Sequence, residues 1–70
     1  MSKRVWTFNV FVGGTLAGNL YEVSDDSRGR WEWVPNGKVG LYFYPTFLDA
    51  KDGIVKMHNV SYNAVTFKDC

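Results

Sequence analysis

Side chains that could carry out covalent or acid–base chemistry are few in this 70-residue chain. There is one cysteine, Cys70, at the last position, and one histidine, His58. Nucleophilic catalysis needs a nucleophile held beside a base, and terminal residues are the least ordered part of a domain. We therefore interpret Cys70 as a free thiol and His58 as a strand residue without a catalytic role. The enzymatic alternative would use His58 with Asp49 or Asp52.

Cofactor and metal sites also lack their usual ligands. A single cysteine excludes an internal disulfide, and one histidine with one cysteine is too few for a structural zinc site. Gly13-Gly14 lacks the further glycines and the lysine of a phosphate-binding loop. We expect the adjacent acids Asp25 and Asp26 to be solvated in a polar loop over residues 24–29. The sequence thus predicts no cofactor, no metal and no catalytic residue.

The charge of the chain is nearly balanced, with eight basic and seven acidic residues and a formal net charge of +1. Such a charge argues against an acidic mimic of DNA and against binding of a phosphate backbone through bulk positive charge. The apolar stretch over residues 8–20 is interrupted by asparagines and glycines. We therefore expect no signal peptide, no membrane span and a cytoplasmic location.

The clearest structural signal lies over residues 30–44, where two runs rich in aromatic and β-branched residues flank Pro35-Asn36-Gly37. This pattern predicts a β-hairpin. We expect a three-residue loop, because proline suits the first central position of a type I turn and glycine suits the φ > 0 position that follows. The alternative, a two-residue Asn36-Gly37 loop, needs a backbone N–H that Pro35 lacks.

The choice of loop decides which side chains share a face of the sheet. The three-residue loop pairs Trp33 with Val39 and Trp31 with Leu41, which makes one face apolar. The other face would hold a mixed set: Arg30, Glu32, Val34, Lys38, Tyr42 and Tyr44. The rejected register would instead place both tryptophans beside the two tyrosines.

An earlier hairpin is predicted from the alternation of residues 5–12, the Gly13-Gly14 turn and a second strand over residues 15–23. In this register the expected cross-strand pairs are Val12 with Thr15, Phe11 with Leu16, Val10 with Ala17, and Phe8 with Asn19. The glycines at positions 13, 14 and 18 also leave room for a longer loop.

The last third of the chain is expected to begin with one short helical turn near residues 46–52, capped by Thr46 and stopped at Gly53. A loop with an Asp52-Gly53 turn is the alternative. Further strands are expected over residues 54–58 and 60–67. The predicted fold class is therefore all-β, with five or six short antiparallel strands in a small sandwich or partly open barrel, as one domain over residues 1–70.

Aromatic residues make up 17% of the chain, and a domain this small cannot bury both faces of every strand. We expect an exposed contact surface on a non-enzymatic protein-binding module that occludes a site on a larger protein. Its size and lack of catalytic chemistry suggest, by analogy alone, an accessory inhibitor of the kind that phages and mobile elements use against host defences. The predicted contact residues are Asp25, Asp26, Arg28, Arg30, Glu32, Tyr42 and Tyr44.

Two other partners fit the same sequence. A single-stranded nucleic acid or a nucleotide would stack on Tyr42 and Tyr44 beside Arg30 and Lys38, with Phe11 or Arg28 extending the surface. A homodimer is also possible, because one core of this size rarely contributes more than roughly 3–5 kcal/mol to stability.

Overall fold

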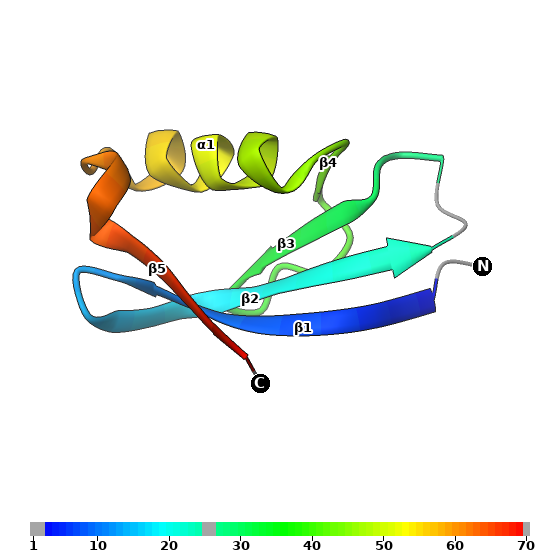
Figure 1. Cartoon of the computed structure of the whole chain (residues 1–70), viewed down its shortest axis with the longest axis horizontal. Coiled ribbons are helices and arrows are strands. Elements are labelled where there is room, and N and C mark those ends of the chain that lie inside the picture. The colour runs from blue at the N-terminus through cyan, green and yellow to red at the C-terminus, as the bar shows by residue number, and fades with distance from the viewer. Residues whose placement is uncertain (1–2, 25–26, 70) are drawn as a thin grey trace.

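A computed structural model describes residues 3–24 and 27–69. The chain forms a five-stranded antiparallel sheet in the order β4-β3-β2-β1-β5, with a helix across one face (Figure 1). The elements are β1 (Lys3–Val12), β2 (Thr15–Ser24), β3 (Trp31–Pro35), β4 (Tyr42–Tyr44), α1 (Phe47–His58), the 3-10 turn η1 (Tyr62–Ala64) and β5 (Val65–Asp69). The predicted all-β class of five or six antiparallel strands is confirmed as a mostly β fold with five strands in one sheet, and the layer packed on that sheet is a helix. Within the described residues, no helix is long and apolar enough to cross a membrane.

The first hairpin forms around Gly13-Gly14, whose φ angles of 59° and 85° are those that glycine adopts without strain. The predicted pairs Val12–Thr15 and Phe11–Leu16 are confirmed. A bulge then adds one residue to β2, so that Phe8 pairs with Leu20 instead of Asn19. The predicted register was wrong from this point because it would have turned the asparagine toward the core and the leucine away from it.

The second hairpin has a longer loop than predicted. Trp31 pairs with Tyr44 and Trp33 with Tyr42, and residues 36–41 connect the two strands. A turn does form after Pro35, whose carbonyl accepts a hydrogen bond from the N–H of Lys38 at 2.8 Å. The chain does not return to the sheet there, so β4 begins only at Tyr42. Both tryptophans point into the core as predicted, but the two tyrosines lie on the same face and not on the opposite one.

The helix is longer than the single turn predicted over residues 46–52, and it includes residues 54–58, which were wrongly predicted to form a strand. Thr46 caps it as expected, since its hydroxyl oxygen accepts the N–H of Asp49 at 3.1 Å. Gly53 does not end the helix: a Cβ at this position would overlap the phenol of Tyr44, so glycine lets the ring approach. The helix ends at Asn59, which adopts the left-handed conformation with φ 53°.

The core fills the space between α1 and the sheet face that it covers, which we call the helix-covered face. Its fully or nearly fully buried members are Val10, Leu20, Trp33, Ala50, Ile54 and Val65. Around them the rings of Phe8, Trp31, Phe47 and Phe67 contact one another, with centroids between 4.8 and 6.2 Å apart. Such ring pairs add to the area that they bury. Many of the aromatic side chains of the protein therefore lie on the helix-covered face.

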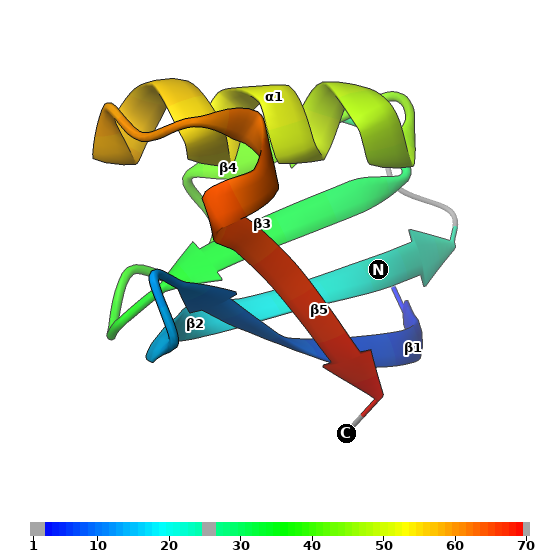
Figure 2. The ribbon, with the colours of Figure 1, turned by 60° about the vertical axis from the view of Figure 1, so that its left-hand side comes forward.

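The last strand, β5, lies next to β1 at the edge of the sheet opposite β4. After the helix, η1 is held to the first turn by a hydrogen bond from the N–H of Gly13 to the carbonyl of Ala64, at 3.0 Å. β5 then runs antiparallel to β1, with Val10 opposite Phe67 (Figure 2). The strand predicted over residues 60–67 was thus placed too early, because η1 occupies its first part.

Candidate functional site

The two tyrosines of the predicted contact set lie on the helix-covered face and not on the outer one. Tyr42 and Tyr44 are half-buried and pack against the core, because their register with β3 places them beside the tryptophans. Burial raises the pKa of the Tyr44 phenol, and the nearby Tyr42 and Asp52 raise it further. The predicted outward orientation of the two tyrosines was therefore wrong, and their role as contact residues stays a prediction.

The other predicted contact residues are divided among different parts of the molecule. Arg30 lies beside β2, where its Nε donates to a carboxylate oxygen of Glu22 at 2.9 Å. Asp25 and Asp26 lie outside the described residues. Arg28 and Glu32 are on the sheet face opposite α1. Of the predicted set, Arg28 and Glu32 therefore lie on the same face. Phe43, which is opposite Glu32 and under Arg28, was not predicted as a contact residue.

The sheet face opposite α1, which we call the open face, carries a row of four side chains on neighbouring strands. Thr7 on β1, Tyr21 on β2, Glu32 on β3 and Phe43 on β4 lie side by side in the register of the sheet. Two arginines lie on the rings of this row: the guanidinium carbon of Arg4 is 3.8 Å from the Tyr21 ring centroid, and that of Arg28 is 3.9 Å from the Phe43 centroid. Each contact joins a cation to the negative face of a ring.

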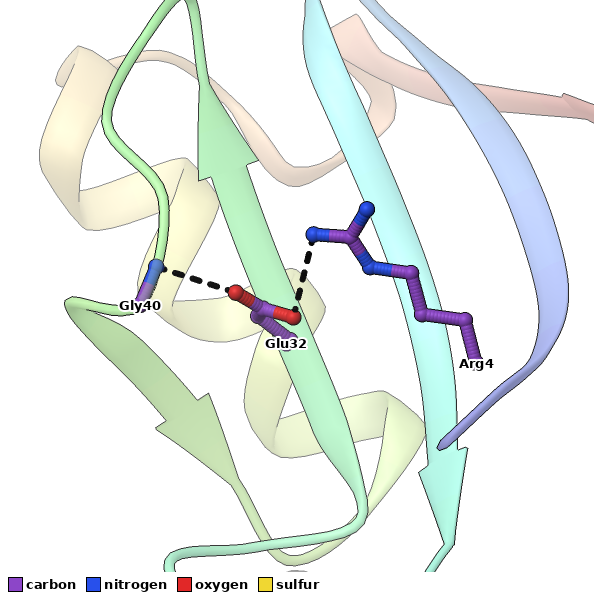
Figure 3. Close-up of polar contacts among 3 residues, drawn as sticks. All are labelled: Arg4, Glu32 and Gly40. Carbon is purple, nitrogen blue, oxygen red and sulfur yellow. Dashed lines mark hydrogen bonds and ion pairs between the residues drawn. The ribbon is translucent and has the colours of Figure 1, made fainter. Parts of the chain in front are cut away.

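Glu32 is the central residue of the open face, and only 5% of its surface is exposed. One carboxylate oxygen lies 3.5 Å from Nη2 of Arg4, and the other accepts the backbone N–H of Gly40 at 3.0 Å (Figure 3). A carboxylate removed from water is costly unless it is paired and hydrogen-bonded. The ion pair with Arg4 and the hydrogen bond from Gly40 compensate the Glu32 charge. Through them Glu32 connects the N-terminal end of β1 to the loop 36–41.

The loop 36–41 is tied to the body of the protein at both of its ends. The N–H of Asn36 donates to the carbonyl of Ala17 at 3.3 Å, and Gly40 is held by Glu32. Val39 lies between these two hydrogen-bonded residues and Leu41 directly follows Gly40. Each is 63% exposed, although the sequence predicted both to be buried against the tryptophans. The feature that sequence reasoning passed over is Gly40, which interrupts the apolar run between Val39 and Leu41.

The rest of the open face carries polar side chains together with Phe11 and Leu16, which are opposite each other in the register. Asn19 donates its side-chain amide to the side-chain oxygen of Asn9 at 2.8 Å, which joins β1 to β2 across the face. The ammonium of Lys68 lies 5.6 Å from the ring centroid of Phe11. Basic groups, aromatic rings and amides thus lie close together on the open face, and the Glu32 carboxylate among them is paired with Arg4.

The residues of the enzymatic alternative are not assembled. His58, which was predicted to lie in a strand, is in the last turn of α1, and Asp49 is in the first turn. Nine residues of helix correspond to a rise of about 13 Å. Asp52 pairs with Lys56 at 3.0 Å instead. Among the described residues, no group of three or more histidine, cysteine, aspartate or glutamate side chains could hold a metal ion.

A shallow depression of about 500 Å³ lies near the start of β3, lined by Val5, Glu22, Val23, Ser24, Gly29, Arg30 and Pro45. The charged groups in its wall, Glu22 and Arg30, are paired with each other. The depression therefore presents no uncompensated charge that would select a charged ligand. Two of the exposed large hydrophobic residues of the surface, Val39 and Leu41, lie on the loop 36–41 beside the open face; others are Val5, Trp6, Leu16 and Leu48.

Comparison of the chain with models of protein families, with curated proteins and with solved structures finds no match.

Proposed function

We propose that this protein is a non-enzymatic, cytoplasmic protein-binding module that covers a site on a larger protein, as accessory inhibitors do. Its contact surface in this proposal is the loop 36–41 together with the adjoining part of the open face. The observation that carries the proposal is the exposure of Val39 and Leu41, at 63% each, on a loop whose backbone is held by Glu32.

Single exposed aliphatic residues are common on protein surfaces. Several of them held together on an ordered segment indicate an interaction site. Here two aliphatic side chains flank Gly40, the residue that Glu32 holds. A loop that is fixed before binding loses less conformational entropy when a partner arrives, and so more of the contact energy remains as affinity. Glu32, which is nearly buried, therefore acts in the proposal as a positioning residue for the loop and not as a contact residue.

The surface beside the loop supports a protein partner as well. The guanidinium groups of Arg4 and Arg28 lie over rings, so they are positioned while they remain on the surface. Arginine and aromatic residues are enriched among the residues that dominate protein interfaces. Arg4 contacts Glu32, which holds Gly40 between Val39 and Leu41, so apolar and basic groups lie on neighbouring parts of this surface, as they do in protein contacts.

The test compares a double change in the loop with a single control change on α1. The variant Val39→Ser with Leu41→Ser removes the apolar contact at two exposed positions, so its thermal unfolding should stay close to that of the wild type. Leu48→Ser is the control, because Leu48 is 65% exposed on α1, away from the loop. Quantitative affinity capture from the native host, read by mass spectrometry, should show a protein retained by wild type and control and lost from the loop variant. Equal capture by all three proteins would reject the loop as the contact surface.

Single-stranded nucleic-acid binding is the second candidate, and the open face favours it by a specific arrangement. Phe11, Tyr21 and Phe43 each have a cation over or near the ring. Aromatic rings beside basic groups on a sheet are the usual platform for stacked bases. Phe11 and Arg28 were predicted from sequence as extensions of this surface, whereas Tyr42 and Tyr44 lie on the other face.

Fluorescence anisotropy with labelled oligo-dT and oligo-U separates the two candidates. Nucleic-acid binding requires an affinity that falls steeply as salt is raised, and Lys68→Glu should weaken it because the lysine lies on this face. No binding of either oligonucleotide at low salt would remove the second candidate and leave the protein-binding proposal standing. Self-association as a homodimer remains a prediction that sedimentation of the purified protein would test.

A further inference from the structure

A buried indole N–H in the core is hydrogen-bonded to a sulfur atom. Trp33 is fully buried, and its Nε1 donates to Sδ of Met57 across 3.4 Å. The indole N–H is a donor that needs a partner when it is buried, and a thioether is a weak acceptor. One of the largest side chains of the core therefore has its polar atom satisfied by a single methionine from α1.

Met57 reaches from this contact to the surface. It lies in the last turn of α1, and 41% of its surface is exposed. The thioether thus belongs to a side chain that a small solute in water can reach, whereas Trp33 on the other side of the contact cannot be reached. Methionine is oxidised to the sulfoxide by two-electron oxidants when it is accessible, and reductases reverse the change.

We propose that Met57 is a reversible oxidation site whose state is transmitted to the core through Trp33. This inference is independent of the proposed function. The oxidant class is a hydroperoxide, with hydrogen peroxide as the simplest member. The sulfur lone pair attacks one peroxide oxygen, the O–O bond breaks and an S–O bond forms. Sulfur is oxidised by two electrons, and the peroxide is reduced to one molecule of water.

The change matters because of where the new oxygen atom must go. A sulfoxide oxygen is a stronger acceptor than a thioether sulfur, so it competes well for the indole N–H. No atom can be inserted between Nε1 and Sδ while they remain 3.4 Å apart. Either the last turn of α1 moves away to let an N–H···O bond form, or the oxygen points to water and the N–H···S bond is strained. Both outcomes alter the surroundings of Trp33.

The experiment uses the full-length protein treated with hydrogen peroxide. Peptide mapping by mass spectrometry measures the oxygen added at Met57, and the indole N–H resonances in a ¹H–¹⁵N spectrum report on Trp33, with Trp6 and Trp31 as internal references. Met57→Leu is the control, because peroxide can still oxidise Met1 and the Cys70 thiol in it but not residue 57. We expect Met57 to be oxidised at a rate comparable to that of free N-acetylmethionine, and the Trp33 indole resonance to move in wild type but not in the control.

Methionine sulfoxide reductase should return the Trp33 resonance to its starting position. Two results would overturn the proposal. One is oxidation of Met57 with the Trp33 indole resonance unchanged, which would show that the core does not sense the sulfur. The other is resistance of Met57 to peroxide that fully oxidises free N-acetylmethionine, which would show that the sulfur is not reachable.

Discussion

The helix-covered face of the sheet is filled with aliphatic side chains and rings in contact, whereas the open face is held by a paired carboxylate, an amide pair and cations on rings. Burial of apolar area contributes most of the stability of a domain. Polar and cation–ring contacts at a surface contribute less and fix geometry instead. One face thus keeps the chain folded, and the other positions exposed groups that can change with smaller loss of stability.

The largest expected effect lies on the helix-covered face. Ile54→Ala should lower the free energy of unfolding by about 2–5 kcal/mol, because it leaves a cavity where Ile54 is fully buried between α1 and the sheet. Leu48→Ala, on the exposed side of the same helix, should change it by less than about 0.5 kcal/mol. Urea denaturation followed by circular dichroism measures both. Similar losses for the two variants would contradict the placement of Ile54, and Ile54→Val gives a milder variant if the alanine variant is unfolded.

A smaller loss is expected from the centre of the open face. Glu32→Ala should cost about 1–3 kcal/mol, because it leaves the Gly40 N–H without its acceptor and Arg4 without its carboxylate. Glu32→Gln should cost less, since the amide oxygen can still accept from Gly40. The same urea titration checks this order, and a glutamine variant as unstable as the alanine variant would show that charge pairing, and not the loop contact, dominates.

Gly53→Ala tests how closely β4 and α1 approach. Alanine is favoured over glycine inside a helix by about 1 kcal/mol, so the change would stabilise an unobstructed helix. Here the added methyl would overlap the phenol of Tyr44, and overpacking typically costs about 1–3 kcal/mol. We expect a small net destabilisation, which should turn into stabilisation in a Tyr44→Leu background. Stabilisation by Gly53→Ala alone would place the ring elsewhere.

The smallest effect is a dependence on alkaline pH. The pKa of Tyr44 is raised above the ordinary tyrosine value of 10.0 in the folded protein, chiefly by burial. The folded state therefore holds this proton more tightly than the unfolded chain does. Its contribution to stability is complete below pH 10 and is lost as the pH rises through the folded-state value. Tyr44→Phe should remove this part of the alkaline loss in urea titrations above about pH 10, and an unchanged pH profile would be inconsistent with a buried phenol.

Features of the fold that depend on neighbouring residues were predictable from sequence. The Gly13-Gly14 turn, the Thr46 cap and the inward orientation of Trp31 and Trp33 each follow from a local pattern, and the structure contains all of them. The antiparallel class with five strands follows from the same patterns. Local chemistry was sufficient for these features because turns, caps and alternation are decided within a few residues.

The features that were not predictable depend on contacts between separate elements. Gly53 indicates a helix stop from sequence alone, and only the ring of Tyr44 against α1 explains why it lies inside the helix. Likewise, the three-residue loop was reasonable for Pro35, but the hydrogen bond from Gly40 to Glu32 extends the connection and reverses the face of the tyrosines. The predicted outward orientation of the tyrosines was wrong with that register. Tyr42, and not Val39, lies opposite Trp33, and a shift by this odd number of residues exchanges the two faces of a strand.

The central claim is that the Glu32 carboxylate holds the loop 36–41 in the shape that exposes Val39 and Leu41. Amide hydrogen exchange of Gly40 tests it most directly, with the amide of Gly37 in the same loop as the reference. We predict that the Gly40 amide exchanges more slowly than that of Gly37 in the wild type and loses this protection in Glu32→Ala, while the amides of β1 and β2 stay protected. An unprotected Gly40 amide in the wild type, or protection that survives Glu32→Ala, would contradict the claim.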